Sequence, residues 1–172
     1  MKRIALDLNT EEGRSKVGAT WRRALGFVPG EANEGLVARR EGSPARLADY
    51  DDSGWEVCTN VGDFVSTGVT FAWYRTTLTL PETLDGLPIS GASITFETNI
   101  DDYGEVWVNG EIDLMTGTVQ GFNRQQRVLL ARPATAGTKY VIACLAANGP
   151  LGKPGGGVFM RYATLAFEWY GI

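Results

Sequence analysis

The stretch SITFETNIDDYGEVWVNG, residues 93–110, decides the fold class of this chain. Apolar or β-branched residues alternate with polar ones over 93–100 and again over 103–108, which is the period of a half-buried β-strand. Asn109-Gly110 follows at once, and this dipeptide is a strong signal for a hairpin turn. We therefore predict two strands and a returning strand over 111–114.

Similar patterns surround this stretch. Short runs rich in aromatic and β-branched residues, separated by turn clusters, predict further strands at 70–80, 126–131, 139–146 and 158–169. The run 139–146 is apolar on both faces, as expected for a central strand. The turn clusters are 81–91, 116–124, 132–138 and 148–157. This spacing predicts an all-β antiparallel β-sandwich, and a jelly roll is a common arrangement of about eight such strands.

The first third of the chain has a weaker pattern. Residues 21–28 are interpreted as a strand, although Val17, Trp21 and Leu25 also fall at helical spacing. Residues 29–46 are polar and are expected to form a long surface loop. We predict one domain over 1–172, with an N-terminal strand and loop in 1–45 and the core jelly roll in 46–170.

Composition excludes several classes of function. The 16 Lys and Arg against 20 Asp and Glu give a net charge of −4, so a nucleic-acid partner is not expected. The chain has no histidine, which removes imidazole general bases, His-ligated zinc and Ser-His-Asp triads. Two cysteines, Cys58 and Cys144, lie in apolar stretches and are expected to be reduced and buried.

The N-terminal sequence predicts the cellular location of the protein. Its apolar run stops at Leu6, before Asp7, which is too short for the core of a signal peptide. No stretch approaches the ~18 apolar residues of a membrane helix. We therefore expect a cytoplasmic protein without a membrane partner.

The predicted strand 103–108 carries the first group of candidate ligand-binding residues. Alternation places Tyr103, Glu105 and Trp107 on one face, and Asp102 precedes them. Aromatic rings that stack on sugar C–H faces, with carboxylates that accept from hydroxyls, are typical of saccharide recognition. The alternative is structural, because acidic residues in turns are usually solvated and a strand Trp is usually in the core.

Other candidates come from distant parts of the chain. Trp73 and Arg75 share one face of the strand 70–80, and Arg75 is expected either to pair with a carboxylate or to contact a ligand. The same two alternatives apply to Arg161. Asn123 and Asn148 follow or precede glycines in turns, where asparagine closes the turn or reaches a ligand at the rim of the sandwich.

These strings together resemble a known family. DYDDSGWE at 49–56, FAWYRTTLTLP at 71–81, IDDYGEVWVNG at 100–110 and RYATLAFEW at 161–169 are similar to a galactose-binding-like jelly-roll domain. The similarity is to the sugar-binding domain of family 2 glycoside hydrolases and, more closely, to the β-sandwich domain fused to gluconolactonase/SMP-30-type proteins.

The resemblance implies a non-catalytic carbohydrate-binding or accessory module, whose partner is a saccharide or another polyhydroxylated small molecule. It implies no cofactor. Domains of this family often hold a structural calcium ion, for which Asp51, Asp52, Asp101 and Asp102 are candidate ligands.

Two alternatives remain open at this stage. One is a small stand-alone jelly-roll enzyme, an isomerase, cyclase or hydrolase that uses Asp and Glu as acid–base groups on a sugar or natural product. The other is an assembly domain that forms a homodimer through a sheet face.

Overall fold

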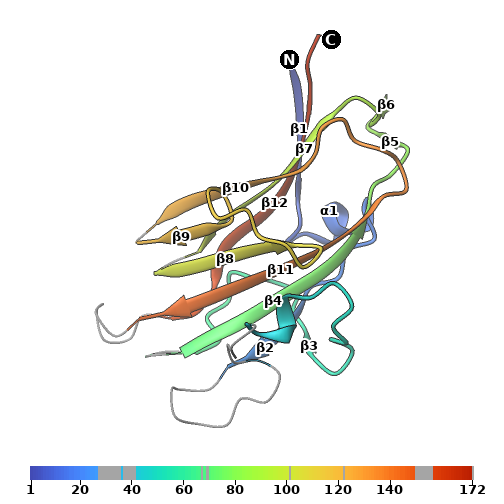
Figure 1. Cartoon of the computed structure of the whole chain (residues 1–172). Coiled ribbons are helices and arrows are strands. Elements are labelled where there is room, and N and C mark those ends of the chain that lie inside the picture. The colour runs from blue at the N-terminus through green and yellow to red at the C-terminus, as the bar shows by residue number, and fades with distance from the viewer. Residues whose placement is uncertain are drawn as a thin grey trace.

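Two antiparallel sheets form the framework of the protein in a computed structural model (Figure 1). The structure describes residues 1–26, 36, 42–66, 68, 70–100, 102–121, 123–149 and 157–171. The four-stranded sheet contains, in spatial order, β1 (Lys2–Asp7), β12 (Met160–Trp169), β7 (Ser93–Ile100) and β10 (Arg124–Ala131). The six-stranded sheet contains β3 (Glu56–Val57), β2 (Arg22–Leu25), β4 (Thr70–Thr79), β11 (Lys139–Asn148), β8 (Tyr103–Val108) and β9 (Thr118–Gln120).

The remaining elements are short. A two-stranded ribbon is formed by β5 (Thr83–Leu84) and β6 (Leu87–Pro88). The helical elements are α1 (Glu11–Ser15) and the 3-10 turn η1 (Pro44–Arg46). Thr10 caps α1 by accepting a hydrogen bond from the Gly13 amide. The all-β antiparallel sandwich predicted from the sequence is confirmed.

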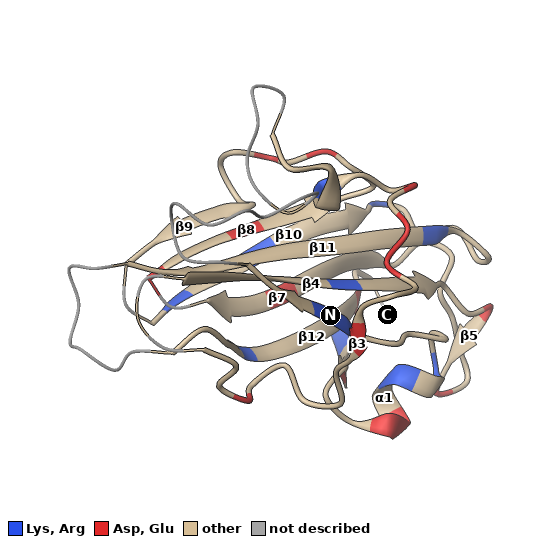
Figure 2. Cartoon of the chain, turned by 90° about the horizontal axis from the view of Figure 1, so that it is seen from below, with Lys and Arg blue, Asp and Glu red and all other residues tan. Residues whose placement is uncertain are grey.

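The hydrophobic core lies between the two sheets. Figure 2 shows β4 and β11 in one layer and β7 and β12 in the layer below. The inward residues of the first layer include Tyr74, Cys144 and Val106, and those of the second include Phe96 and Phe167, all of them fully buried. Burying one large apolar side chain stabilises a fold by about 1.5–3 kcal/mol, so this interdigitated layer supplies most of the driving force.

The central strand was predicted correctly. β11 pairs with β4 on one side and with β8 on the other, and its apolar residues face both the core and the outer surface. Both cysteines are buried and unbridged, as predicted.

Two predictions about the middle of the chain are wrong. Residues 111–114 do not return as a strand, because Glu111 forms a single bridge to Val108 before the chain turns away. The turn is closed by Asp113, whose backbone oxygen accepts from the Gly117 amide at 2.6 Å. The strand that pairs with β8 is β9, which lies inside the stretch 116–124 that we expected to be a turn.

The N-terminal third also differs from prediction. The first residues form β1, which pairs with residues 164–169 of β12, and α1 follows; the sequence pattern predicted neither element. The predicted strand 21–28 is confirmed over 22–25, and residues 27 and 28 lie outside the described residues. Of the predicted loop 29–46, the structure describes residues 36 and 42–46. No helix in the described part of the chain has the length and hydropathy required to cross a membrane.

Candidate functional site

The outer face of the six-stranded sheet brings together the aromatic residues that the sequence singled out. Strand pairing sets Trp73 of β4 beside Leu145 of β11, and Leu145 beside Glu105 of β8. The two flanking rows, with β4, β11 and β8 in the same order, are Phe71–Ala147–Tyr103 and Arg75–Ala143–Trp107. Residues that alternation placed on one face of each strand therefore form a single surface.

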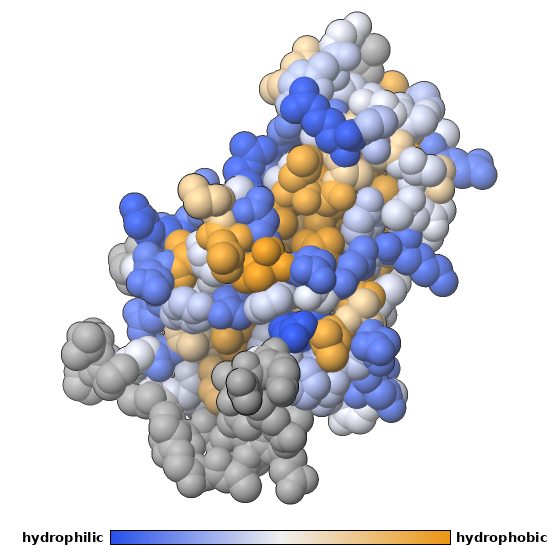
Figure 3. Space-filling view, viewed as in Figure 1, coloured by the Kyte–Doolittle hydropathy of each residue, from blue (hydrophilic) through white to orange (hydrophobic). Residues whose placement is uncertain are grey.

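A hollow of about 650 Å³ lies over these rows, and we call it the aromatic trough. It is lined by Phe71 and Trp73 from β4, Leu145 and Ala147 from β11, Tyr103, Glu105 and Trp107 from β8, with Leu36, Gly42, Ser43, Arg46, Gly110 and Glu111 around them. The short side chain of Ala147 between Phe71 and Tyr103 leaves space that a larger residue would fill. Figure 3, which presents the molecule as in Figure 1, shows hydrophobic residues in the middle of the visible surface and hydrophilic residues toward its margins.

Glu105 is the carboxylate held between two rings of the trough. Its Oε1 accepts a hydrogen bond from the Tyr103 hydroxyl at 2.5 Å, and its Oε2 accepts from Trp107 Nε1 at 2.8 Å. Both donors are two positions away on the same strand, so the period of the strand itself creates the cluster. A carboxylate has about four acceptor positions, so Glu105 can orient both rings and still accept from a ligand hydroxyl.

The Tyr103 hydroxyl acts as a neutral donor in this cluster. Burial and the neighbouring Glu105 carboxylate raise the pKa of Tyr103 to about 12. The group therefore keeps its proton at physiological pH and donates a hydrogen bond to Glu105.

The two tryptophans contact two residues at the border of the trough, Leu36 and Arg46. Trp73 Nε1 donates to the Leu36 carbonyl at 3.3 Å. The Arg46 guanidinium lies over the Trp107 ring, 5.3 Å from its centroid, in a cation–π arrangement. The Trp107 face thus already accepts a positively polarised group.

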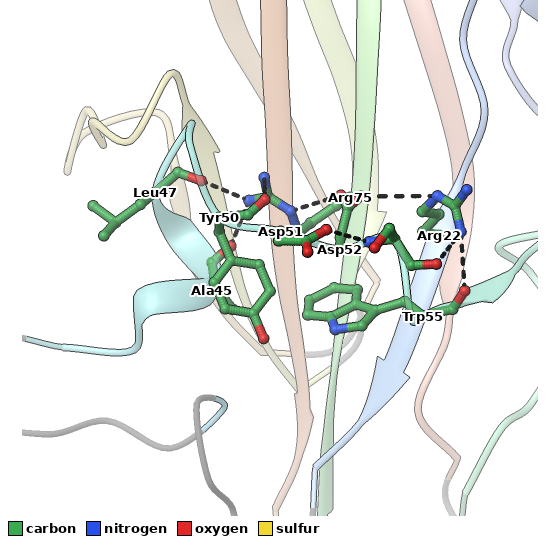
Figure 4. A network of polar contacts seen from close by, with 9 residues as sticks. Arg22, Ala45, Leu47, Tyr50, Asp51, Asp52, Trp55 and Arg75 are labelled. Atoms are coloured by element: carbon green, nitrogen blue, oxygen red, sulfur yellow. Dashed lines mark hydrogen bonds and ion pairs between the residues drawn. The ribbon is translucent and has the colours of Figure 1, made fainter.

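Arg75 anchors residues 45–52 on the sheet and is not part of the trough lining (Figure 4). Its side chain is 2% exposed, and Nε donates to Asp52 Oδ2 at 2.9 Å. Nη1 donates to the carbonyls of Ala45 and Leu47, at 2.6 and 2.9 Å, and Nη2 to that of Tyr50 at 3.4 Å. Of the two alternatives for Arg75, the structure therefore shows the internal ion pair, and its planar fork holds residues 45–52 on the sheet.

The remaining predicted residues lie apart from the trough. Asp102 Oδ2 accepts from the Gly149 amide at 2.9 Å, and Asn148 Nδ2 donates to the Gly68 carbonyl at 2.8 Å, so both join loops at one end of the sandwich. Asn123 Oδ1 accepts from Asn99 Nδ2 at 2.9 Å in a second hollow. Arg161 belongs to β12 of the other sheet, where its guanidinium lies over Phe159.

Four of the nine predicted residues thus line one hollow, namely Trp73, Tyr103, Glu105 and Trp107. Sequence reasoning missed Phe71, Arg46 and Leu145. Phe71 had a usable signal, because it lies two positions before Trp73 on the same strand. To find Leu145, one has to know how β11 pairs with β4 and β8, and to find Arg46, one has to know the course of residues 42–56. No local sequence pattern shows either.

The structure describes three of the four candidate calcium ligands. Asp52 pairs with Arg75, Asp51 Oδ1 accepts from the Ser53 amide at 2.9 Å, and Asp101 lies outside the described residues. The described part of the chain holds no group of three or more Cys, Asp or Glu side chains placed to bind a metal ion. Because Asp101 is not among the described residues, the calcium site stays a prediction.

The comparisons with known proteins give fold-level relatives. No protein-family model matches the chain, and no curated protein matches it. Among solved structures, β-glucuronidase 2 of Bacteroides uniformis is similar with a TM-score of 0.63 at 17% identity, over 96% of this chain and 18% of that one. A family 2 glycoside hydrolase of Bacteroides cellulosilyticus has a TM-score of 0.60 at 15% identity, over 98% of this chain and 21% of that one.

A third solved structure is similar to this chain to about the same degree. A protein of Bacteroides fragilis that is assigned as a β-galactosidase has a TM-score of 0.59 at 16% identity, over 98% of this chain and 24% of that one. This chain spans about a fifth of the length of these enzymes. The resemblance expected from the sequence is thus confirmed for the fold: the chain is folded as a β-sandwich portion of family 2 glycoside hydrolases is folded.

Proposed function

We propose that this chain is a non-catalytic carbohydrate-binding module and that the saccharide lies in the aromatic trough. One observation carries the proposal: the rings of Phe71, Trp73, Tyr103 and Trp107 line a single hollow together with the Glu105 carboxylate. The β-sandwich likeness to family 2 glycoside hydrolases supports a sugar-related role.

The chemistry of the trough suits a sugar ring. The apolar C–H face of a pyranose packs against an aromatic ring, while its hydroxyls need acceptors and donors at the edge. Glu105 supplies the acceptors, and Ser43 and Arg46 at the border supply polar groups. A few hydrogen bonds at about 0.5–1.5 kcal/mol each, offset by immobilisation of the ligand, give an expected Kd between micromolar and millimolar.

Calorimetric titration with a panel of mono- and oligosaccharides tests the proposal. Trp107→Ala removes a stacking surface and is expected to weaken binding at least tenfold, and Glu105→Gln to weaken it by a similar factor. Tyr170→Ala is the matched control, because this aromatic residue is 56% exposed and lies just after β12, outside the trough. Absence of heat with every sugar, together with an unchanged Tm, would rule out the proposal.

A small acid–base enzyme is the second candidate, because Glu105 and Glu111 line the same hollow. A pair of carboxylates is the minimal equipment of most glycoside hydrolases. The panel sugars are therefore incubated with the protein and followed by chromatography. Turnover that disappears in Glu105→Gln and in Glu111→Gln would favour the enzyme, whereas unchanged sugars after prolonged incubation would favour binding alone.

A further inference from the structure

A second hollow, of about 750 Å³, lies where β7, β9 and β10 meet, and we call it the amide pocket. Its described lining consists of Asn99, Thr118, Val119, Gln120, Asn123, Arg124 and Gln125. Four of these seven residues carry a carboxamide, and none carries an aromatic ring or a carboxylate. Carboxamides both donate and accept hydrogen bonds, so this lining complements hydroxyl groups.

Asn99 gives the pocket a feature that the fold alone does not explain. The residue is 4% exposed, and its Nδ2 donates to Asn123 Oδ1. Its Oδ1 is buried and has no hydrogen-bond partner among the described residues. A buried acceptor without a donor is unfavourable, so a ligand hydroxyl at this position would satisfy it.

The amide pocket begins one strand beyond the aromatic trough. Gln120 of β9 is paired with Tyr103 of β8, and Thr118 is paired with Glu105. Directly paired residues share a face of the sheet, so Gln120 and Thr118 continue the rows that start at Phe71 and Trp73 on β4. With strands about 4.8 Å apart, the rows extend about 14 Å from β4 to β9. This span exceeds the length of one sugar ring.

We propose that the ligand is an oligosaccharide that crosses the strands, with stacked units in the aromatic trough and a further unit in the amide pocket. The inference rests on the proposed function, because it assigns a ligand class to the same surface. The two linings determine which part of the ligand each hollow binds: the aromatic rings bind the apolar faces of the first sugar units, and the carboxamides bind the hydroxyls of the last.

The test uses a length series of the saccharide that binds best, from the monosaccharide to the tetrasaccharide, titrated into the whole chain. Affinity is expected to rise with length until the amide pocket is reached. Gln120→Ala and Asn123→Gly are expected to lower the affinity for the longest ligand about fivefold each and to leave that for the shortest unchanged. Glycine is chosen at 123 because Asn123 has a φ of 55°, a conformation that glycine keeps without strain.

Two further variants make the outcomes distinct. Arg127→Ala, on the same strand as Arg124 but outside the pocket, is the control and is expected to bind the whole series like the unchanged protein. Trp107→Ala is expected to weaken every member of the series. Equal affinity for short and long ligands, or long-ligand affinity that is insensitive to Gln120→Ala and Asn123→Gly, would overturn the inference and leave the proposed function intact. Lack of binding at every length would overturn both.

Discussion

Arg75 Nε and Asp52 Oδ2 are separated by 2.9 Å, and the arginine end of this ion pair is almost completely removed from solvent. The same guanidinium satisfies three carbonyls of the segment 45–52, so one side chain carries the attachment of that segment to the outer face of β4 (Figure 4). The border of the aromatic trough therefore depends on a residue that does not line the trough.

Arg75→Met is expected to lower the free energy of unfolding by about 3 kcal/mol, because removing one partner of a buried pair leaves the other groups unsatisfied. Urea denaturation measures this change. Arg127→Met is the matched control: Arg127 Nε lies the same 2.9 Å from Glu97 Oε1, but its side chain is 55% exposed. The control is expected to cost less than about 1 kcal/mol. Equal losses of unfolding free energy in the two variants would show that the burial of Arg75 does not increase its contribution to stability.

Ala147→Leu tests whether the trough is the binding site without removing any ring, and Ala143→Leu shows for comparison what the same substitution does at a buried position on the same strand. Ala147 lines the trough, so Ala147→Leu is expected to fill it and abolish saccharide binding with little change in Tm. Ala143 is completely buried against Trp73 and Ala45, so Ala143→Leu is expected to destabilise the fold by about 1–3 kcal/mol through overpacking. Normal binding by a folded Ala147→Leu variant would place the ligand elsewhere.

The stability of the fold is expected to fall at alkaline pH. Since the pKa of Tyr103 is raised to about 12 in the folded protein, from an ordinary value near 10, the folded state holds this proton after the unfolded state has released it. The contribution is complete below pH ~10 and disappears as the pH rises through ~12. Urea denaturation at a series of pH values from 8 to 11 should show a shallower decline for Tyr103→Phe than for the unchanged protein. Parallel declines would contradict the assignment.

The two thiols are expected to be inert in the folded protein. Cys144 is completely buried and Cys58 nearly so, and burial raises the pKa of both thiols. A chromogenic disulfide reagent should therefore react slowly under native conditions and with both thiols at once in guanidinium chloride. Rapid reaction of one thiol in native buffer would reveal an opening of the sandwich around that cysteine.

The longer strands from residue 70 onward were predictable because each carries its own signal, whereas the short strands β5, β6 and β9 lie in stretches that we expected to be turns. The predicted strands 93–100 and 103–108 coincide with β7 and β8, and 139–146 lies within β11. In 93–100 and 103–108, side chains on one face are packed in the core, so burial imposes period-two alternation. The run 139–146 is instead apolar on both faces because β11 is the central strand between β4 and β8. The N-terminal strand β1 was not predicted because it is an edge strand in which Leu6 is the one buried residue.

The candidate site was predictable only in part, for a similar reason. Alternation along β8 places Tyr103, Glu105 and Trp107 together, and this cluster was expected from the sequence. Whether Trp73 joins them depends on the register of β11 between β4 and β8, which is set by pairing across many residues. Arg75 shares a face with Trp73, but no local pattern indicates that the segment 45–52 covers it.

The pairing of β1 with β12 couples the first residues of the chain to some of the last. β12 also separates β1 from β7, so the four-stranded sheet has no continuous hydrogen-bonded structure until residues 160–169 are in place (Figure 1). Such non-local pairing is associated with slow folding. A ribosome-bound chain that ends before β12 would therefore leave one edge of β7 without its hydrogen-bonding partner, and a synthetic β12 peptide added in trans would be expected to pair with that edge.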